Sequence, residues 1–269
     1  MQAEIDGGTI YYELAGEGPL VTLTHGIGGS AAEWTAVVPL LAERYRVLTY
    51  DGRGFGRSTK DPEGEHSIER FARDLAGLLD LVGARKAAVV GHSMGGTVVQ
   101  RFLLDFPERA VAGVIMSTSS KVNDKGRDYW DGQAAYIEQH GMRAWTERNR
   151  APHITKEFLR DHPEVRESEE RRIAMNDPRV YGKVARVVAR YDYTDELPRV
   201  AVPTLVMVGS ADTQTPPGGS VIISRAIPGA TLHILDGLGH GLPREAPEKV
   251  AGLLLPFLDA LPRTAEWGG

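Results

Sequence analysis

The sequence predicts an α/β protein in which a mostly parallel β-sheet is flanked by helices and carries an inserted helical lid. Short apolar runs of strand length alternate with amphipathic helical patterns through the first 117 residues, an order typical of parallel sheets wrapped by helices. Most of these runs are almost continuously apolar, as strands buried on both faces are. Residues 121–198 hold 30 charged residues in 78, against 37 in the other 191, and show no buried-strand pattern.

The expected strands are short apolar runs bounded by turns or helical patterns. They comprise Thr9–Leu14, Leu20–Thr24, Arg46–Tyr50, Lys86–Val90, Ala112–Ser117, Thr204–Val208 and Thr231–Leu235. Because strands resume after Pro203, we interpret the charged segment 121–198 as a helical cap or lid. It is inserted into one core domain, formed by residues 1–120 and 199–269. A separate second domain is the alternative interpretation.

The expected helices have apolar residues at helical spacing. They comprise Ala31–Glu43, Ser67–Val82, Met94–Phe106, Trp130–His140, Pro178–Arg190 and Pro247–Leu258. Ser67 is an expected N-cap, and Gly83 and Pro107 are expected to end the helices that precede them. The block Glu164–Arg172 has mixed charges at i,i+4 spacing, which predicts a solvent-exposed helix face.

The composition excludes several classes of protein. The chain of 269 residues is 42% hydrophobic and 25% charged, which is ordinary for a globular domain and excludes a disordered or fibrous chain. It has no cysteine, so disulfides, thiol nucleophiles and cysteine-bound metals are excluded. A net charge of -5 disfavours nucleic acid as a partner. The first residues show no secretion signal, and no apolar stretch is long enough for a membrane helix. We therefore expect a cytoplasmic protein.

The stretch Gly91–Gly96, with the sequence GHSMGG, carries the clearest chemical motif. It follows an expected strand and opens an expected helix. In that context, Gly-x-Ser-x-Gly places the serine on a sharp turn where flanking side chains would clash. Ser93 is therefore the candidate nucleophile, and a purely structural Gly/Ser turn is the alternative.

A serine hydroxyl needs a base to act as a nucleophile near neutral pH, and histidine is the usual one. In this architecture the order along the chain is serine, acid, histidine. His240 lies on a glycine-rich loop after the strand Thr231–Leu235, and Asp212 closely follows the preceding strand. We therefore expect Asp212 to orient His240 and His240 to activate Ser93. Asp236 is the rival acid, in a position typical of a residue that stabilises its own loop.

Acyl transfer also needs hydrogen-bond donors for the oxyanion that develops on the substrate carbonyl. The backbone N–H of Met94 follows the nucleophile, and that of Ile27 lies in the loop after the strand Leu20–Thr24. We expect these two groups to form the oxyanion hole. The same loop, Gly26–Ala31, also matches a dinucleotide-binding fingerprint, with Asp51 ending the next strand. A nucleotide-binding protein is thus a competing hypothesis, although it leaves the order of serine, aspartate and histidine unexplained.

Five motifs in order resemble those of the α/β-hydrolase superfamily, over about residues 8–260. They are His25-Gly26, Asp51–Ser58, Gly91–Gly96, Gly209 with Asp212, and Gly239-His240. Within the superfamily, the sequence most resembles the 3-oxoadipate enol-lactonases and related small carboxylesterases, through stretches such as Phe106–Arg109 and Val202–Val206. The resemblance implies an eight-stranded sheet. It also implies a serine hydrolase that cleaves a small ester or lactone through an acyl-enzyme on Ser93, without a metal or organic cofactor.

The candidate substrate-pocket residues are three lid side chains, Trp130, Trp145 and Arg143, and Trp34 beside the oxyanion loop. An arginine can clamp a substrate carboxylate, although a solvated helix face is the simpler interpretation for any single arginine, and Trp34 fits a core position equally well. The expected partner is a small ester or lactone. The same scaffold supports rival functions: carbon–carbon bond hydrolases of ring-cleavage products, cofactor-free perhydrolases and a non-enzymatic ligand receptor.

Overall fold

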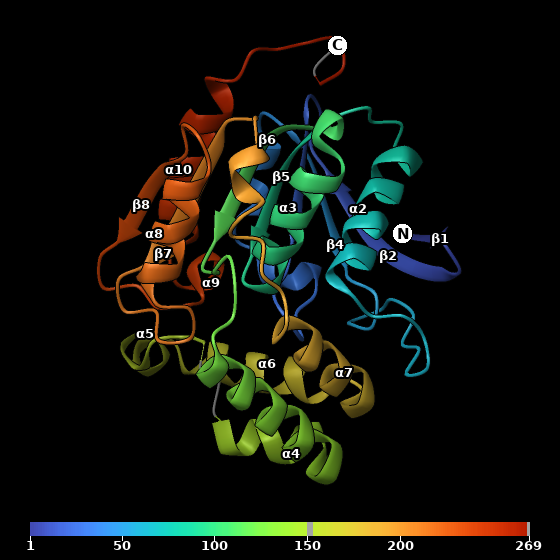
Figure 1. The fold of residues 1–269 in the computed structure, drawn as a ribbon, viewed down its shortest axis with the longest axis vertical. Coiled ribbons are helices and arrows are strands. Elements are labelled where there is room, and N and C mark those ends of the chain that lie inside the picture. Colours follow the sequence, from blue (N-terminus) through green and yellow to red (C-terminus); the bar gives the residue numbers. More distant parts are fainter. Residues whose placement is uncertain (150–152, 268–269) are drawn as a thin grey trace.

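The computed structural model describes residues 1–149 and 153–267. An eight-stranded sheet forms its centre, with the strand order β1-β2-β4-β3-β5-β6-β7-β8 (Figure 1). The strands are β1 (Gln2–Ile5), β2 (Gly8–Ala15), β3 (Leu20–Thr24), β4 (Arg46–Asp51), β5 (Ala87–His92), β6 (Ala110–Met116), β7 (Thr204–Gly209) and β8 (Thr231–Leu235). β2 pairs antiparallel with β1 and β4, and all other neighbours pair in parallel. The predicted fold class is confirmed.

Strand β1 has no counterpart among the expected strands. Asp6 and Gly7 connect it to β2 with φ values of 45° and 76°, and an Asp-Gly pair with positive φ at both residues is typical of a two-residue hairpin turn. Ile5 lies opposite Gly8 in this hairpin. Ala3 and Ile5 are buried in the core. The Asp-Gly pair is therefore the signal for β1 that the sequence contains.

Helices cover both faces of the sheet (Figure 1). One face packs against α2 (Ile68–Leu81), α3 (Met94–Asp105) and α8 (Pro217–Ala226), and the other against α1 (Val38–Ala42) and α10 (Pro247–Asp259). In β5, Val89 belongs to the first hydrophobic cluster, whereas Ala88 and Val90 belong to the second, because successive strand side chains point to opposite faces. Burial on both faces explains the almost continuous apolar runs in the sequence.

The expected helix Ala31–Glu43 is wrong as one continuous element. The structure has a 3-10 turn at Ala31–Trp34 and then the short helix α1. Pro39 lies in the first turn of α1, and a proline cannot donate the amide hydrogen that a helix continuing through it would need. The start of α2 is confirmed, since the side chain of its N-cap residue Ser67 accepts a hydrogen bond from the Arg70 N–H.

In the described residues, four α-helices form the insertion between β6 and β7. They are α4 (Asp124–Asn149), α5 (Lys156–Asp161), α6 (Pro163–Ala174) and α7 (Pro178–Val188). They gather below the sheet, at one end of its strands (Figure 1), which confirms the inserted helical lid. α4 is kinked at Gly141, where φ is 80°. Within the described parts of the chain, no helix has the length and apolar character needed to cross a membrane.

Candidate active site

Ser93 lies on the turn between β5 and α3 with φ 55° and ψ −120°, a conformation that strains residues other than glycine. Its N–H donates to the Met116 carbonyl at 2.9 Å. The turn also requires glycines on both sides. A Cβ on Gly91 would lie 2.1 Å from the Gly95 carbonyl oxygen, and a Cβ on Gly95 would lie 2.2 Å from that of Thr24. The local sequence thus holds the serine at the C-terminal end of β5.

His240 and Asp212 lie in the loops after β8 and β7, and the structure brings them together. His240 Nδ1 lies 2.9 Å from Asp212 Oδ2. The carboxylate also accepts from the N–H groups of Gln214 and Thr215 and from the Thr215 hydroxyl, at 2.9, 2.8 and 2.8 Å. Burial would raise the pKa of Asp212, but the charge of His240 and these hydrogen bonds hold it below its usual value. An ionised Asp212 places the imidazole proton on Nδ1 and leaves Nε2 as the basic nitrogen.

The pKa of His240 lies below its usual value. Burial is the main cause, and the positive charge of His92 acts in the same direction, while the charge of Asp212 opposes both. At neutral pH the ring is therefore uncharged and can accept a proton. Asp236, the rival acid, instead accepts a hydrogen bond from the Ser210 hydroxyl at 3.2 Å.

A buried pair, Glu33 and His92, is a feature that the sequence motifs do not reveal. His92 Nδ1 lies 2.9 Å from Glu33 Oε1, and His92 Nε2 lies 2.7 Å from the carbonyl oxygen of His240. Since both partners are acceptors, both ring nitrogens donate and the ring is positively charged. Burial alone would lower the pKa of His92, but Glu33 raises it. Burial alone would likewise raise the pKa of Glu33, but His92, together with His25 and Arg172, lowers it to about 2.

This pair connects three parts of the site. His92 directly precedes Ser93 in the chain, its ring centroid lies 4.9 Å from that of His240, and its partner Glu33 accepts from the Gly26 N–H at 3.3 Å. The serine turn, the histidine loop and the loop after β3 are thus tied to one another through a single buried ion pair.

Ile27 lies in the loop after β3, which we call the oxyanion loop (residues 25–30). The Gly29 N–H donates to the Gly26 carbonyl at 3.0 Å and closes a turn around Ile27. In the described residues, neither the Ile27 N–H nor the Met94 N–H donates to another group of the protein. Both amides therefore keep their hydrogen-bonding capacity for a ligand.

His25 attaches this loop to the chain after β4. Its Nδ1 lies 2.6 Å from the Gly26 carbonyl oxygen, and its Nε2 accepts from the Gly52 N–H at 2.8 Å. One nitrogen thus donates and the other accepts, which requires a neutral ring. Burial lowers the pKa of His25, in agreement with that state.

The loop does not have the features of a dinucleotide site. A four-residue 3-10 turn follows it, whereas the pyrophosphate of a dinucleotide binds at the N-terminus of a full helix. Both carboxylate oxygens of Asp51 are also engaged, with the Ala31 N–H at 2.8 Å and with Arg57 Nε at 2.7 Å. Asp51 therefore anchors the residue that follows the oxyanion loop, and its carboxylate is not free to bind a ribose.

The four expected pocket residues lie in different environments. Trp34 has no exposed surface and packs in the core cluster of α1 and α10. Arg143 has 89% of its side chain exposed and pairs with Glu147, so the structure does not bring it to the site. Trp145 is buried in the lid with its ring centroid 5.8 Å from that of Tyr181. Trp130 is half-buried in α4 and packs against the same hydrophobic cluster. Trp130 and Trp145 stay predictions.

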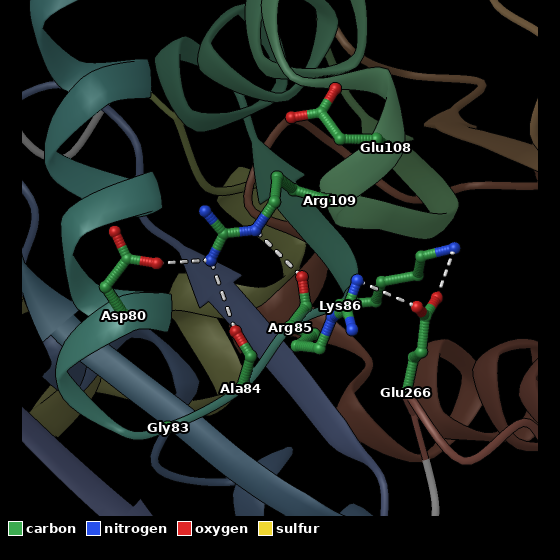
Figure 2. A pocket seen from close by; sticks show the side chains of 8 residues that line it. All are labelled: Asp80, Gly83, Ala84, Arg85, Lys86, Glu108, Arg109 and Glu266. Atoms are coloured by element: carbon green, nitrogen blue, oxygen red, sulfur yellow. Dashed lines mark hydrogen bonds and ion pairs between the residues drawn. The ribbon is translucent and has the colours of Figure 1, made fainter.

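A cavity of about 510 Å³ lies at the opposite edge of the sheet, where the chain enters β5 and β6 (Figure 2). Its cationic side chains are engaged by acids: Arg109 contacts Asp80 at 2.6 Å, and Lys86 contacts Glu266 at 2.7 Å. Because Ser93 follows β5 rather than preceding it, this cavity is not part of the candidate active site. The described residues also contain no cluster of histidine, aspartate and glutamate side chains arranged to hold a metal ion.

Known proteins resemble this chain over most of its length. The model of the alpha/beta hydrolase fold family matches residues 19–247. "Putative carbamate hydrolase RutD" of Azorhizobium caulinodans is 28% identical over 250 residues, which are 92% of this chain and 94% of that protein. 3-Oxoadipate enol-lactonase 2 of Acinetobacter baylyi is 26% identical over 218 residues, 81% and 80% of the two chains. A malate-bound thermophilic esterase from Thermogutta terrifontis is 29% identical, with a TM-score of 0.89 over 96% and 98% of the chains. The resemblance to enol-lactonases is confirmed.

Proposed function

This chain belongs to the α/β-hydrolase family, and on that basis we propose that it is a serine hydrolase of small carboxylic esters or enol-lactones. The contact of 2.9 Å between His240 and Asp212, beside the strained serine turn, is the observation that carries the proposal. The uncharged state of His240 and the two unengaged amides of the oxyanion loop and the serine turn support it further.

In the proposed reaction, Ser93 Oγ attacks the carbonyl carbon of the substrate while its proton passes to His240 Nε2. The negative charge moves to the carbonyl oxygen, where the N–H groups of Ile27 and Met94 stabilise it. The intermediate then expels the alcohol or enol oxygen, which takes the proton from His240. Water, activated by the same histidine, next hydrolyses the acyl-enzyme and regenerates Ser93.

The substrate class rests on the relatives and on the lid. An esterase and an enol-lactonase lie among the similar proteins, and both names describe hydrolysis of a carboxylic ester bond. The carbamate hydrolase relative favours carbamates as a second candidate class, since the carbonyl carbon of a carbamate is open to the same attack. We propose Trp130 and Trp145 as the aromatic side chains of the lid that contact the acyl group.

Hydrolysis of p-nitrophenyl acetate by wild type and by Ser93→Ala tests this function. We expect a pre-steady-state burst of p-nitrophenol in the wild type and a loss of turnover of roughly 10⁴-fold or more in the variant. The control Ser168→Ala removes an exposed hydroxyl of the lid and should leave the rate unchanged. Equal rates in wild type and Ser93→Ala would reject the serine mechanism.

The same pair of proteins then distinguishes the substrate classes. Enol-lactones, simple alkyl esters and carbamates are compared by kcat/KM, and the class with the highest value identifies the reaction. Peracid formation from hydrogen peroxide, cleavage of a carbon–carbon bond, or stoichiometric capture without turnover would each replace the proposed hydrolysis.

A further inference from the structure

We infer that the lid residues Arg172 and Asn176 are positioning residues, which hold the oxyanion loop in its catalytic shape through the Gly28 carbonyl. The inference rests on the proposed function. It makes the lid part of the catalytic apparatus, beyond any role as a cover that selects substrates.

Arg172, near the end of α6, reaches out of the lid to the core domain. Its Nη1 donates at 2.8 Å to the carbonyl of Gly28, the residue that follows Ile27, whose N–H is the proposed oxyanion donor. Asn176 lies between α6 and α7, and its Nδ2 donates to the same carbonyl at 3.0 Å and to the Ile173 carbonyl, near the end of α6, at 2.9 Å. Two lid donors thus fix one carbonyl of the oxyanion loop.

Packing at Gly28 strengthens this connection. Gly28 has φ 68°, and a Cβ there would lie 2.6 Å from Cε2 of Tyr181 and 3.4 Å from Nδ2 of Asn176. Tyr181 belongs to α7 of the lid and is buried. The lid therefore approaches the loop so closely that only a glycine fits between them.

A buried carboxylate, Glu169, extends the same network to the histidine loop. It is 1% exposed and contacts Arg172 on its own helix, Arg244 at 2.9 Å and His153 at 3.1 Å. Arg244 lies in α9 (Leu242–Glu245), directly after the loop of His240. Burial would raise the pKa of Glu169, but the hydrogen bond with His153 and the charges of Arg172 and Arg244 hold it well below its usual value, so the carboxylate is charged and must keep its partners.

A second lid contact reaches the same loop. The hydroxyl of Thr155, the N-cap of α5, donates to Glu245 Oε2 at 2.6 Å. The Glu245 carboxylate in turn accepts from the N–H groups of Gly239 and Gly241 at 3.3 and 3.2 Å. These two glycines flank His240. The lid therefore bonds to both loops that the proposed reaction needs, and displacement of the lid would release both.

The test compares Arg172→Met and Asn176→Ala with the control Arg171→Ala, which removes an exposed arginine from the adjacent position of α6. Misplacing an oxyanion donor should lower kcat by about 10- to 100-fold in Arg172→Met and by a smaller factor in Asn176→Ala. KM should change little. Affinity for a trifluoromethyl ketone, which forms a tetrahedral oxyanion with the serine, should fall in parallel with kcat, whereas a merely structural role would change thermal stability without this parallel.

Hydrogen–deuterium exchange provides a readout that needs no substrate. We expect faster exchange over residues 25–31 in both variants and wild-type exchange in Arg171→Ala. If Arg172→Met does not fold, Asn176→Ala decides, since it removes a single donor to Gly28. The inference would be overturned if Asn176→Ala had the same kcat, the same inhibitor affinity and the same exchange rates as wild type. The two hypotheses can fail separately. If Asn176→Ala shows faster exchange but Ser93→Ala is as active as wild type, the contact between lid and loop stands and the proposed function is rejected.

Discussion

Replacing Glu33 by alanine removes one partner of the ion pair beside the candidate active site. The side chains of His92 and Glu33 are only 5% and 9% exposed and lie 2.9 Å apart, so the variant leaves a buried imidazolium without a counter-charge. Because the pKa of Glu33 falls from 4.5 to about 2, ionisation of Glu33 among its buried neighbours, chiefly His92, stabilises the fold at neutral pH by about 3 kcal/mol, at about 1.36 kcal/mol per pKa unit. Loss of one partner of a buried pair costs about 3–5 kcal/mol in general, which agrees.

Urea and thermal unfolding at pH 7 measure this loss. At about 2–4 °C per kcal/mol for a domain near this size, we expect Glu33→Ala to lower Tm by about 6–12 °C. Glu33→Gln keeps an acceptor oxygen and should lose less. Glu147→Ala, which removes an exposed partner of Arg143, should change the free energy of unfolding by less than about 0.5 kcal/mol.

The difference in unfolding free energy between wild type and Glu33→Ala should depend on pH in a definite direction. The pKa of Glu33 is lowered in the folded state, so its contribution is complete above pH 4.5 and disappears as the pH falls towards 2. The gap in stability between wild type and Glu33→Ala should therefore narrow over that range. A double-mutant cycle with His92→Gln should show coupling. Additive effects of the two substitutions, or a Glu33→Ala variant as stable as wild type, would refute the reasoning.

Three further predictions concern other parts of the site. Because burial lowers the pKa of His240, a pH profile of kcat/KM should stay flat down to a half-point below the usual 6.5, and a half-point at or above it contradicts this. Gly28→Ala adds a Cβ 2.6 Å from Tyr181 at φ 68° and should lower both Tm and kcat. The control Gly132→Ala has open space around the new Cβ and should lower neither. If the two variants have the same Tm and the same kcat, the close approach of Tyr181 to Gly28 is refuted. Trp34→Ala should lose about 3–5 kcal/mol in urea unfolding with KM unchanged, whereas a changed KM would return Trp34 to the pocket wall.

Most strands of the sheet could be predicted from the sequence, because each of them is a local run of apolar residues. The seven expected strands agree with β2–β8 to within about two residues at each end. β1 escaped this reasoning because its signal is the turn at Asp6 and Gly7 rather than a run of apolar residues. The continuous helix expected over Ala31–Glu43 is wrong because Pro39 lacks a backbone N–H. The spacing of apolar residues gives no information on backbone donors.

The contacts that hold the site together are much harder to predict. Glu33 and His92 are 59 positions apart in the chain, and Arg172 and Gly28 are 144 apart, so no local pattern relates them. The block Glu164–Arg172 illustrates this: its alternating charges predict a solvated face, yet Glu169 is 1% exposed and Arg172 bonds to the core domain. A charged helix looks the same in sequence whether it faces water or a buried network.

The fixed charge on His92 also affects the timing of proton transfer in the proposed reaction. When His240 takes the proton of Ser93, two imidazolium rings lie with their centroids 4.9 Å apart in a buried region, where like charges repel strongly. This repulsion costs energy when the serine attacks, and it is released when the proton passes to the departing oxygen. His92 therefore makes His240 a stronger acid at the moment of bond cleavage, which helps the departing oxygen to leave as a neutral alcohol or enol.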